Sequence, residues 1–104
     1  MTIFFAQYHA VPLPHSEQYA ECGGAYVNCW LEAASEDEAH KMASALIHGR
    51  GWQILSVEEE CREVTQASYA DNEEGKEHYD QAVLDGECYV FHQWPVDAGE
   101  TGYA

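Results

Sequence analysis

Residues 25–51, AYVNCWLEAASEDEAHKMASALIHGRG, contain the two patterns that decide the fold. In the first nine of these residues, small or aliphatic side chains alternate with polar or aromatic ones, so that Tyr26 and Trp30 fall on one side. A period of two is typical of a β-strand with one face against a core. The face with the small and aliphatic side chains is expected to pack against a helix. The side with the two aromatic rings must meet solvent, a ligand or another subunit.

A helix is expected directly after this strand. Ser35 followed three residues later by Glu38 forms a capping box, and the two acidic residues between them suit the positive end of a helix dipole. The apolar positions that follow have the spacing of one buried helical face, and Gly49 provides a stop. These positions are Ala39, Met42, Ala43, Leu46 and Ile47.

Three more strands and a second helix are expected along the rest of the chain. Runs of β-branched and aromatic residues bounded by turn residues indicate the strands, and a capping side chain indicates the helix. The expected elements are a strand at Thr2–His9, a Gly- and Pro-containing loop at Ala10–Gly24, a strand at Trp52–Val57 that continues as an exposed edge through Val64, a helix capped by Asp71 or Asn72 and ended by Asp85-Gly86, and a strand at Glu87–Trp94 ended by Pro95.

The first of these strands has apolar side chains on both of its sides. Phe4, Ala6 and Tyr8 alternate with Ile3 and Phe5. Since successive side chains of a strand point to opposite faces, both faces of this strand are expected to be at least half covered.

The order strand-strand-helix-strand-helix-strand predicts a single α+β domain over residues 1–95. Two helices packed on one face of a mixed four-stranded sheet are the expected arrangement. A length of 104 residues suits one hydrophobic core. Residues 96–104 are expected to form a flexible C-terminal tail.

The middle of the chain resembles ferredoxin-like modules in outline. The resemblance rests on the alternating strand, the capped helix at Ser35–Ala39 and the Gly51-Trp52-Gln53-Ile54 entry to the next strand, and it covers about half of the chain. This broad group includes ACT-like regulatory domains and many small bacterial proteins of unknown function. The resemblance implies a ferredoxin-like α+β fold, and it carries no functional residue with it.

Charge is the most unusual property of the sequence. The chain has 19 Asp and Glu against four Lys and Arg, which gives a formal net charge of −15. Such a field repels nucleic acid and anionic lipid and attracts basic proteins. Acidity for solubility alone explains the same composition. The start of the chain has no basic region of a signal peptide, and no apolar run is long enough for a membrane span, so a cytoplasmic location is expected.

Four carboxylates crowd the edge expected after residue 57. They are Glu58, Glu59, Glu60 and Glu63, with Arg62 as the only cation among them. An edge strand presents such side chains outward, where they can recognise a basic protein partner. Charges on an edge also prevent aggregation without any partner, and both interpretations stay open.

Four cysteines and six histidines raise the question of a metal or catalytic site. The spacings lack the close Cys and His pairs of a zinc site, so reduced cysteines and no metal or other cofactor are expected. Cys88 and His92 share one side of a strand, but four residues separate them by about 13 Å, too far for a nucleophile and its base. No catalytic residue is predicted. A binding protein is therefore preferred to an enzyme as the interpretation of this chain.

The candidate interface is the aromatic side of the sheet. It comprises Tyr26 and Trp30 with Tyr89 and Phe91, or with His92 and Trp94 in the other register. Large exposed rings suggest homodimerisation through the sheet face or a ligand or protein partner, unless the loop at residues 10–24 folds over them. The leading hypothesis is a non-catalytic acidic binding or regulatory module that acts through protein–protein interaction. The alternative is a small enzyme or ligand-sensing domain that uses the aromatic and histidine side.

Overall fold

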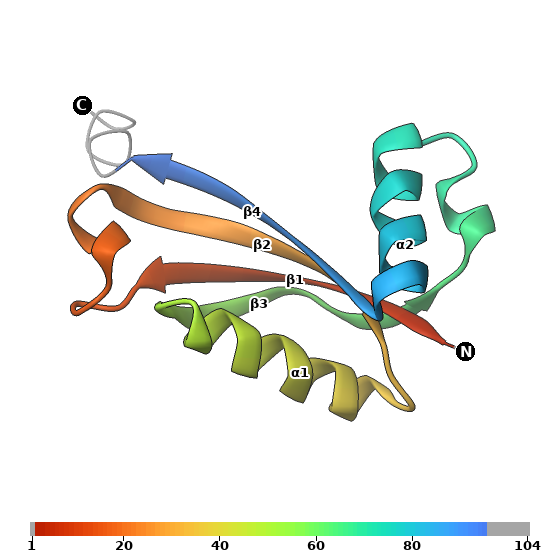
Figure 1. Cartoon of the computed structure of the whole chain (residues 1–104), viewed down its shortest axis with the longest axis horizontal. Helices are drawn as coiled ribbons and strands as arrows, with labels where there is room; N and C mark the ends of the chain where they lie inside the picture. Colours follow the sequence, from red (N-terminus) through yellow and green to blue (C-terminus); the bar gives the residue numbers. More distant parts are fainter. Residues whose placement is uncertain (1, 96–104) are drawn as a thin grey trace.

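The computed structural model describes residues 2–95, which form an α+β domain with one four-stranded sheet and two α-helices (Figure 1). The expected tail at 96–104 lies outside the described residues. No helix in the described part is long and apolar enough to cross a lipid bilayer. The elements are β1 (Ile3–Pro12), a 3₁₀ turn η1 (Glu17–Ala20), β2 (Cys22–Glu32), α1 (Glu36–Gly49), β3 (Trp52–Val64), a second 3₁₀ turn η2 (Gln66–Tyr69), α2 (Glu73–Asp85) and β4 (Glu87–Pro95).

The sheet has the strand order β3-β1-β2-β4, and every neighbouring pair is antiparallel. The prediction of a mixed sheet was therefore wrong. β2 and β3 do run parallel to each other, as expected for strands joined by a helix, but β1 lies between them and pairs antiparallel with both. The expectation that the strand from Trp52 continues to Val64 as an edge was confirmed.

The two helices lie on opposite faces of the sheet, so the prediction of two helices on one face was also wrong. Helix α1 packs with Phe4, Ala6 and Tyr8 of β1, whereas Ala82 of α2 packs with the alternate residues of that strand. We call these sides the α1 face and the α2 face. Because α1 already covers β1 on its own face, the connection from β3 back across the sheet to β4 passes over the other face. In Figure 1, α1 runs along the strands, while α2 stands at one end of the sheet.

Both helices begin at the predicted capping residues. The Ser35 hydroxyl accepts a hydrogen bond from the Glu38 amide at 3.1 Å, and the Asn72 side chain accepts one from the Gly75 amide at 2.9 Å. Gly75 is required by packing, because a Cβ there would lie 2.5 Å from the Tyr69 ring. The glycine that weakens this helix in isolation allows η2 to pack against its first turn.

The predicted loop at residues 10–24 is shorter in the structure, because β1 extends to Pro12 and β2 begins at Cys22. Gly23 and Gly24 at the start of β2 make this extension possible. A Cβ on Gly24 would lie 2.5 Å from the Trp94 ring, which packs directly on the glycine backbone. Residue Gln18 of the remaining loop lines a hollow with Trp52 and Phe91 at the end of the α1 face. This part of the loop therefore lies on the α1 side and not over Tyr26.

Candidate functional site

The candidate interface residues separate onto the two faces. In the β2–β4 register, Tyr26 lies opposite His92 and Trp30 opposite Cys88, whereas Tyr89 lies opposite Cys29. Tyr89 and Phe91 therefore pack with the α1-face cluster, and Phe91 contacts the Trp52 ring at a centroid distance of 5.7 Å. Of the two registers left open by the sequence, the one that groups Tyr26 and Trp30 with His92 and Trp94 is correct.

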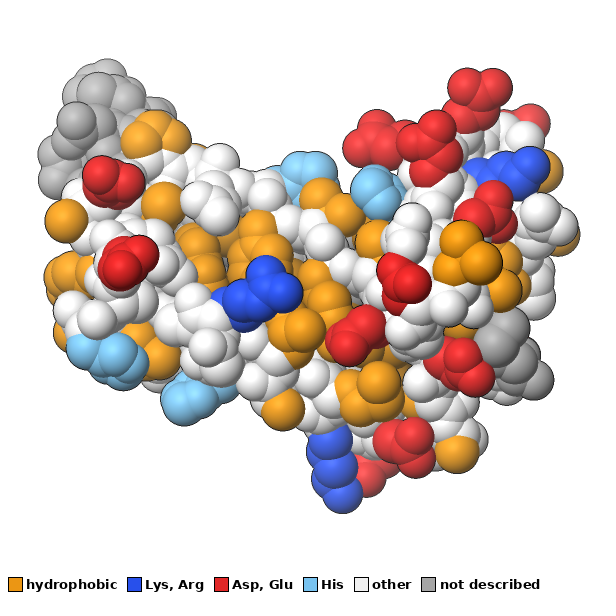
Figure 2. Space-filling model, viewed as in Figure 1, with side chains coloured by type: hydrophobic (Ala, Val, Ile, Leu, Met, Phe, Trp, Pro, Cys, Tyr) orange, Lys and Arg blue, Asp and Glu red, His pale blue; other side chains and the backbone are white. Residues whose placement is uncertain are grey.

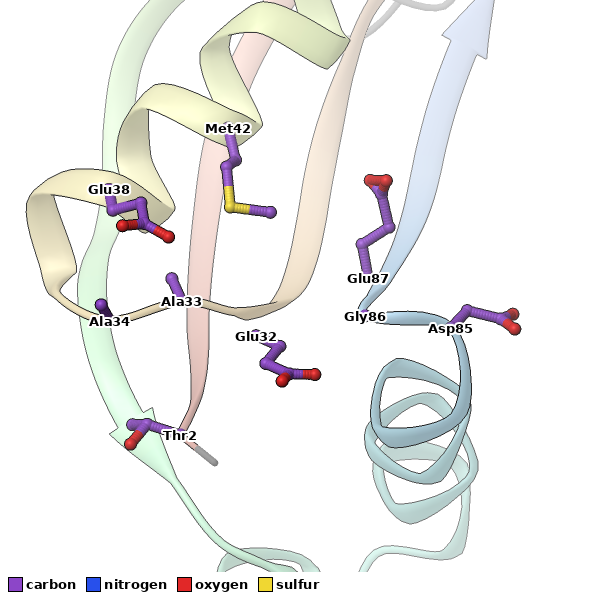
Figure 3. Close-up of a pocket in the computed structure, with 9 residues that line it drawn as sticks. All are labelled: Thr2, Glu32, Ala33, Ala34, Glu38, Met42, Asp85, Gly86 and Glu87. Carbon is purple, nitrogen blue, oxygen red and sulfur yellow. The ribbon is translucent and has the colours of Figure 1, made fainter.

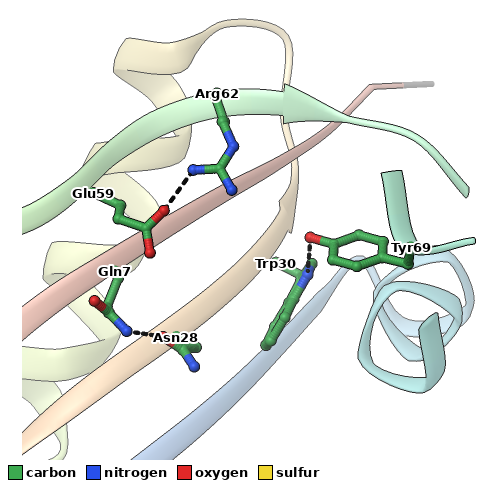
Figure 4. A network of polar contacts seen from close by, with 6 residues as sticks. All are labelled: Gln7, Asn28, Trp30, Glu59, Arg62 and Tyr69. Carbon is green, nitrogen blue, oxygen red and sulfur yellow. Dashed lines mark hydrogen bonds and ion pairs between the residues drawn. The ribbon is translucent and has the colours of Figure 1, made fainter. Parts of the chain in front are cut away.

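Trp30 is part of the core and not of a surface. Only 4% of its area is exposed, and its ring packs between Phe5 and His78 at centroid distances of 5.0 and 4.9 Å. Its indole Nε1 donates a 2.8 Å hydrogen bond to the Tyr69 hydroxyl (Figure 4). Both the apolar ring and the polar N–H are satisfied within the domain, so Trp30 cannot serve as a free contact for a partner.

Part of the α2 face is left uncovered because α2 stands at one end of the sheet. We call its residues the open face: Gln7, His9, Tyr26, Asn28, His92 and Trp94. Three of their rings form a cluster, in which His9 lies 5.5 Å from Tyr26 and 5.6 Å from Trp94, and Tyr26 lies 5.2 Å from Trp94. Tyr26 is 40% exposed. The open face thus presents a cluster of mutually tilted aromatic rings, of which Tyr26 is the most exposed to solvent.

A cleft lies where the open face meets α2. It has a volume of about 270 Å³, with a floor of sheet residues and a wall formed by the first turns of the helix. The lining residues are Phe5, Asn28, Trp30, Asn72, Glu74, Gly75, His78 and His92. Among them, the sequence interpretation missed His78 and Glu74, since only the position of α2 brings them over Asn28 and His92.

Two amide side chains connect the cleft to the rest of the open face. Gln7 donates a 2.8 Å hydrogen bond from its Nε2 to the Asn28 Oδ1 (Figure 4). This bond uses one polar group of each amide and leaves the Gln7 carbonyl and the remaining N–H groups for a ligand. The open face therefore offers directed hydrogen bonds beside its aromatic rings.

The wall of the cleft is acidic. Helix α2 carries five carboxylates and only one Lys, at Glu73, Glu74, Glu77, Asp80, Asp85 and Lys76. Figure 2 shows acidic side chains gathered at the α2 side of a hollow, with histidines at its base. Two of the four Lys and Arg residues are already used in exposed ion pairs, Lys41 with Asp37 at 3.1 Å and Arg62 with Glu59 at 2.7 Å. Of the carboxylates of α2, Glu74 lines the cleft itself.

The candidate acidic patch on β3 is exposed but divided. Glu59 pairs with Arg62, and Glu58 accepts a 2.6 Å hydrogen bond from the Ser56 hydroxyl. Glu60 instead lines a separate hollow with Cys61 and His40 beside α1. The three adjacent carboxylates therefore do not form one outward cluster, and their part in recognition stays a prediction.

The cysteines that approach a possible base are poorly suited to nucleophilic chemistry. The Cys88 Sγ lies 3.7 Å from the His78 Nδ1, and the Cys61 Sγ lies 3.7 Å from the Tyr8 hydroxyl, which also bonds His40 at 2.9 Å. Burial raises the pKa of both thiols above the ordinary value. Because the thiolate is the nucleophile, a raised pKa keeps these groups protonated and unreactive near neutral pH. Cys29 lies on the α1 face, on the other side of the sheet from His9 and His92.

A second, larger hollow of about 460 Å³ lies at the turn between β2 and α1 (Figure 3). Four carboxylates line it, from Glu32, Glu38, Asp85 and Glu87. Figure 3 shows Asp85 directed away from the other three, and its carboxylate accepts a hydrogen bond from Gln81. No group of three or more His, Cys, Asp or Glu side chains within residues 2–95 is arranged to hold a metal ion. The hollow is a crowded charged surface without a converging ligand set.

Comparisons with known proteins found no match. No family model matches it, and neither the curated proteins nor the solved structures contain a significant match. The function must therefore be argued from the cleft and the open face.

Proposed function

We propose that this domain is a non-catalytic binding module that holds a positively charged segment of a basic protein in the cleft and along the open face. The observation that carries the proposal is Glu74 in the wall of a cleft whose lining includes His92, the register partner of Tyr26 in the His9–Tyr26–Trp94 ring cluster. Lys and Arg side chains bind carboxylates by charge and aromatic faces by cation–π attraction. The cleft supplies the carboxylate, and the adjoining open face supplies the rings.

The overall charge supports the same class of partner. A chain with a net charge of −15 accelerates association with cations and discriminates against anions. The amide donors and acceptors of the Gln7 and Asn28 side chains suit the backbone of an extended segment, which has alternating donors and acceptors. The four cysteines are free thiols, and this supports a cytoplasmic location as part of the proposal.

The chain shares a four-stranded antiparallel sheet and two helices with the ferredoxin-like group, which includes ACT-like regulatory domains, but it differs in having its helices on opposite faces of the sheet. The alternative role is a ligand-sensing domain or small enzyme that uses the same histidines. The 3.7 Å approach of His78 to Cys88 favours it, while the raised pKa of that thiol argues against catalysis. A neutral small molecule that binds the cleft more tightly than a cationic peptide would favour this alternative.

A defined peptide tests the proposal. We expect a hexapeptide of alternating Arg and Gly to bind the protein and change its tryptophan fluorescence, and the matching Glu and Gly peptide to have no effect. Binding should weaken by tenfold or more between 0.01 M and 0.15 M salt, because the screening length falls from about 30 Å to about 8 Å.

Two matched pairs of variants separate the cleft from the acidic surface in general. Tyr26→Ala should weaken peptide binding about tenfold, whereas Tyr19→Ala, which removes a ring 52% exposed in η1, should have no effect. Glu74→Gln in the cleft wall should weaken it more than Glu77→Gln on the same helix. Equal effects within each pair would show that the peptide binds the acidic surface without a site, and the proposal would fail.

A further inference from the structure

The two edges of the sheet differ in how they are protected. β3 has 13 residues paired along the 10 of β1, and its register shifts at three places, which indicates β-bulges. It also carries five charged side chains between residues 58 and 63. Bulges and charges are the means by which proteins prevent an edge strand from pairing with another chain. β3 is therefore a blocked edge.

β4 has neither kind of protection over most of its length. It pairs with β2 in continuous register from Gly24↔Trp94 to Leu31↔Glu87, and it contains no Asp, Glu, Lys or Arg from Cys88 to Pro95. Within residues 2–95, β2 is its only strand partner. In an antiparallel pair, every second residue forms backbone hydrogen bonds with the neighbouring strand. The N–H and C=O groups of the residues in between therefore point away from β2, toward the open side of β4.

The side chains of β4 are half-buried on both faces of the sheet. Tyr89 and Phe91 pack on the α1 side and Val90 on the α2 side, and each keeps part of its surface exposed. A neighbouring strand would cover these apolar side chains as well as the backbone edge. β4 thus has the features of an internal strand, although it lies at an edge.

We propose that β4 pairs with β4 of a second copy of this chain, which joins the two sheets into one of eight strands. Charge selects this partner. A basic protein would gain little electrostatic attraction at the edge of β4, because that edge has no carboxylates from Cys88 to Pro95. An identical chain of net charge −15 would meet the least repulsion there, because acidic side chains are absent. This dimer goes beyond the binding of a cationic segment and does not depend on it. It replaces the expected dimer through the sheet face, because the buried Trp30 cannot form that interface.

The geometry of the pairing follows from two-fold symmetry. A two-fold axis perpendicular to the sheet makes the β4 strands antiparallel and keeps both α1 faces on the same side. With Phe91 opposite Phe91 of the second copy, Val90 lies opposite His92 and Tyr89 opposite Gln93. Glu87 then lies opposite Pro95 at each end of the pairing. No two carboxylates of β4 face each other in this register.

Light scattering and amide hydrogen exchange test the dimer together. We expect the wild-type chain to be dimeric at micromolar concentration in 0.15 M salt, with alternate β4 amides as protected as those of β1. The dimer should become tighter as salt rises, because screening reduces the repulsion between the copies, whereas binding of the cationic peptide weakens. The opposite salt responses keep the two proposals distinguishable.

The same substitution on each edge provides a matched control. Gln93 of β4 and Gln53 of β3 are both exposed. Gln93→Glu should raise the dimer dissociation constant about tenfold, because it adds two carboxylates at the shared edge, whereas Gln53→Glu should leave it unchanged. A monomeric wild type, or equal effects of the two variants, would overturn the proposal. So would a dimer whose outward β4 amides exchange freely, or a monomer in which they are protected by residues 96–104.

Discussion

The two faces of one sheet are covered to different extents in this protein. On the α1 face, β1 and β2 carry several alanines, and these pack with Ala39 and Ala43 of α1. The small side chains allow the helix and the sheet to approach each other closely along the strands. On the α2 face the rings of Phe5 and Trp30 hold α2 over one end of the sheet only. The α1 face thus has a core closed along the strands, while the α2 face is partly covered and has a cleft at its boundary.

The largest expected effect separates the covered half of the α2 face from its open half. Trp30→Glu should destabilise the domain by more than about 3 kcal/mol, because it removes a buried ring and places a charge where Tyr69 and Phe5 exclude water. Tyr26→Glu, on the same face of β2, should cost about 1 kcal/mol or less, since this ring is 40% exposed and lies outside the core. Urea unfolding of the two variants measures the difference. Similar losses of stability would show that the open face is as packed as the covered half.

The next effect concerns how η2 holds α2 on its face. Gly75→Ala should cost about 2 kcal/mol, because its Cβ would meet the Tyr69 ring at 2.5 Å and the ring is fixed by the bond to Trp30. Gly49→Ala in the last turn of α1 should be neutral or stabilising by up to about 1 kcal/mol, since a Cβ there meets no atom within 4 Å. Thermal unfolding of both variants gives the comparison. A Gly75→Ala variant as stable as wild type would contradict close packing of η2 on α2.

Much of this contrast can be predicted from the sequence, and the rest depends on long-range pairing. The caps at Ser35 and Asn72 are local signals, and both helices begin where those signals place them. Ile3 and Phe5 beside Phe4 and Tyr8 already indicate a strand covered on both sides, which is what helices on opposite faces provide. Two helices on one face would leave Ile3 and Phe5 uncovered, so the same pattern argues against that arrangement.

The cleft, in contrast, could not be predicted from the sequence. The position of His78 over Trp30 depends on the β2–β4 register and on the place of α2 above the sheet. No local pattern encodes either of them, because a shift by one residue would exchange the two faces of β4. The sequence accordingly allowed Tyr89 or His92 on this face, and only the register decides for His92.

The smallest expected effect compares how dry the two faces are. Burial raises the pKa of the Cys29 thiol on the α1 face far above its ordinary value of 9.0, and Tyr8 on the same face behaves alike. The native state therefore holds protons that the unfolded state releases above about pH 9, so the contribution of these two groups to stability is full below that pH and falls as pH rises further. Each fully buried thiol contributes about 1.4 kcal/mol per pH unit to this fall.

Replacing single cysteines assigns the alkaline loss of stability to a face. Urea unfolding between pH 8 and pH 10.5 should show a fall that Cys29→Ala makes shallower, since the variant lacks the buried thiol. Cys88→Ala on the α2 face should change the slope less, because that thiol is only partly buried. Each substitution also lowers stability at every pH by leaving a small cavity. The comparison therefore uses which variant has the shallower dependence of stability on pH, and not the stability itself. A steeper dependence on Cys88 than on Cys29 would mean that the α2 face is the drier one, and the division into a closed and an open face would be lost.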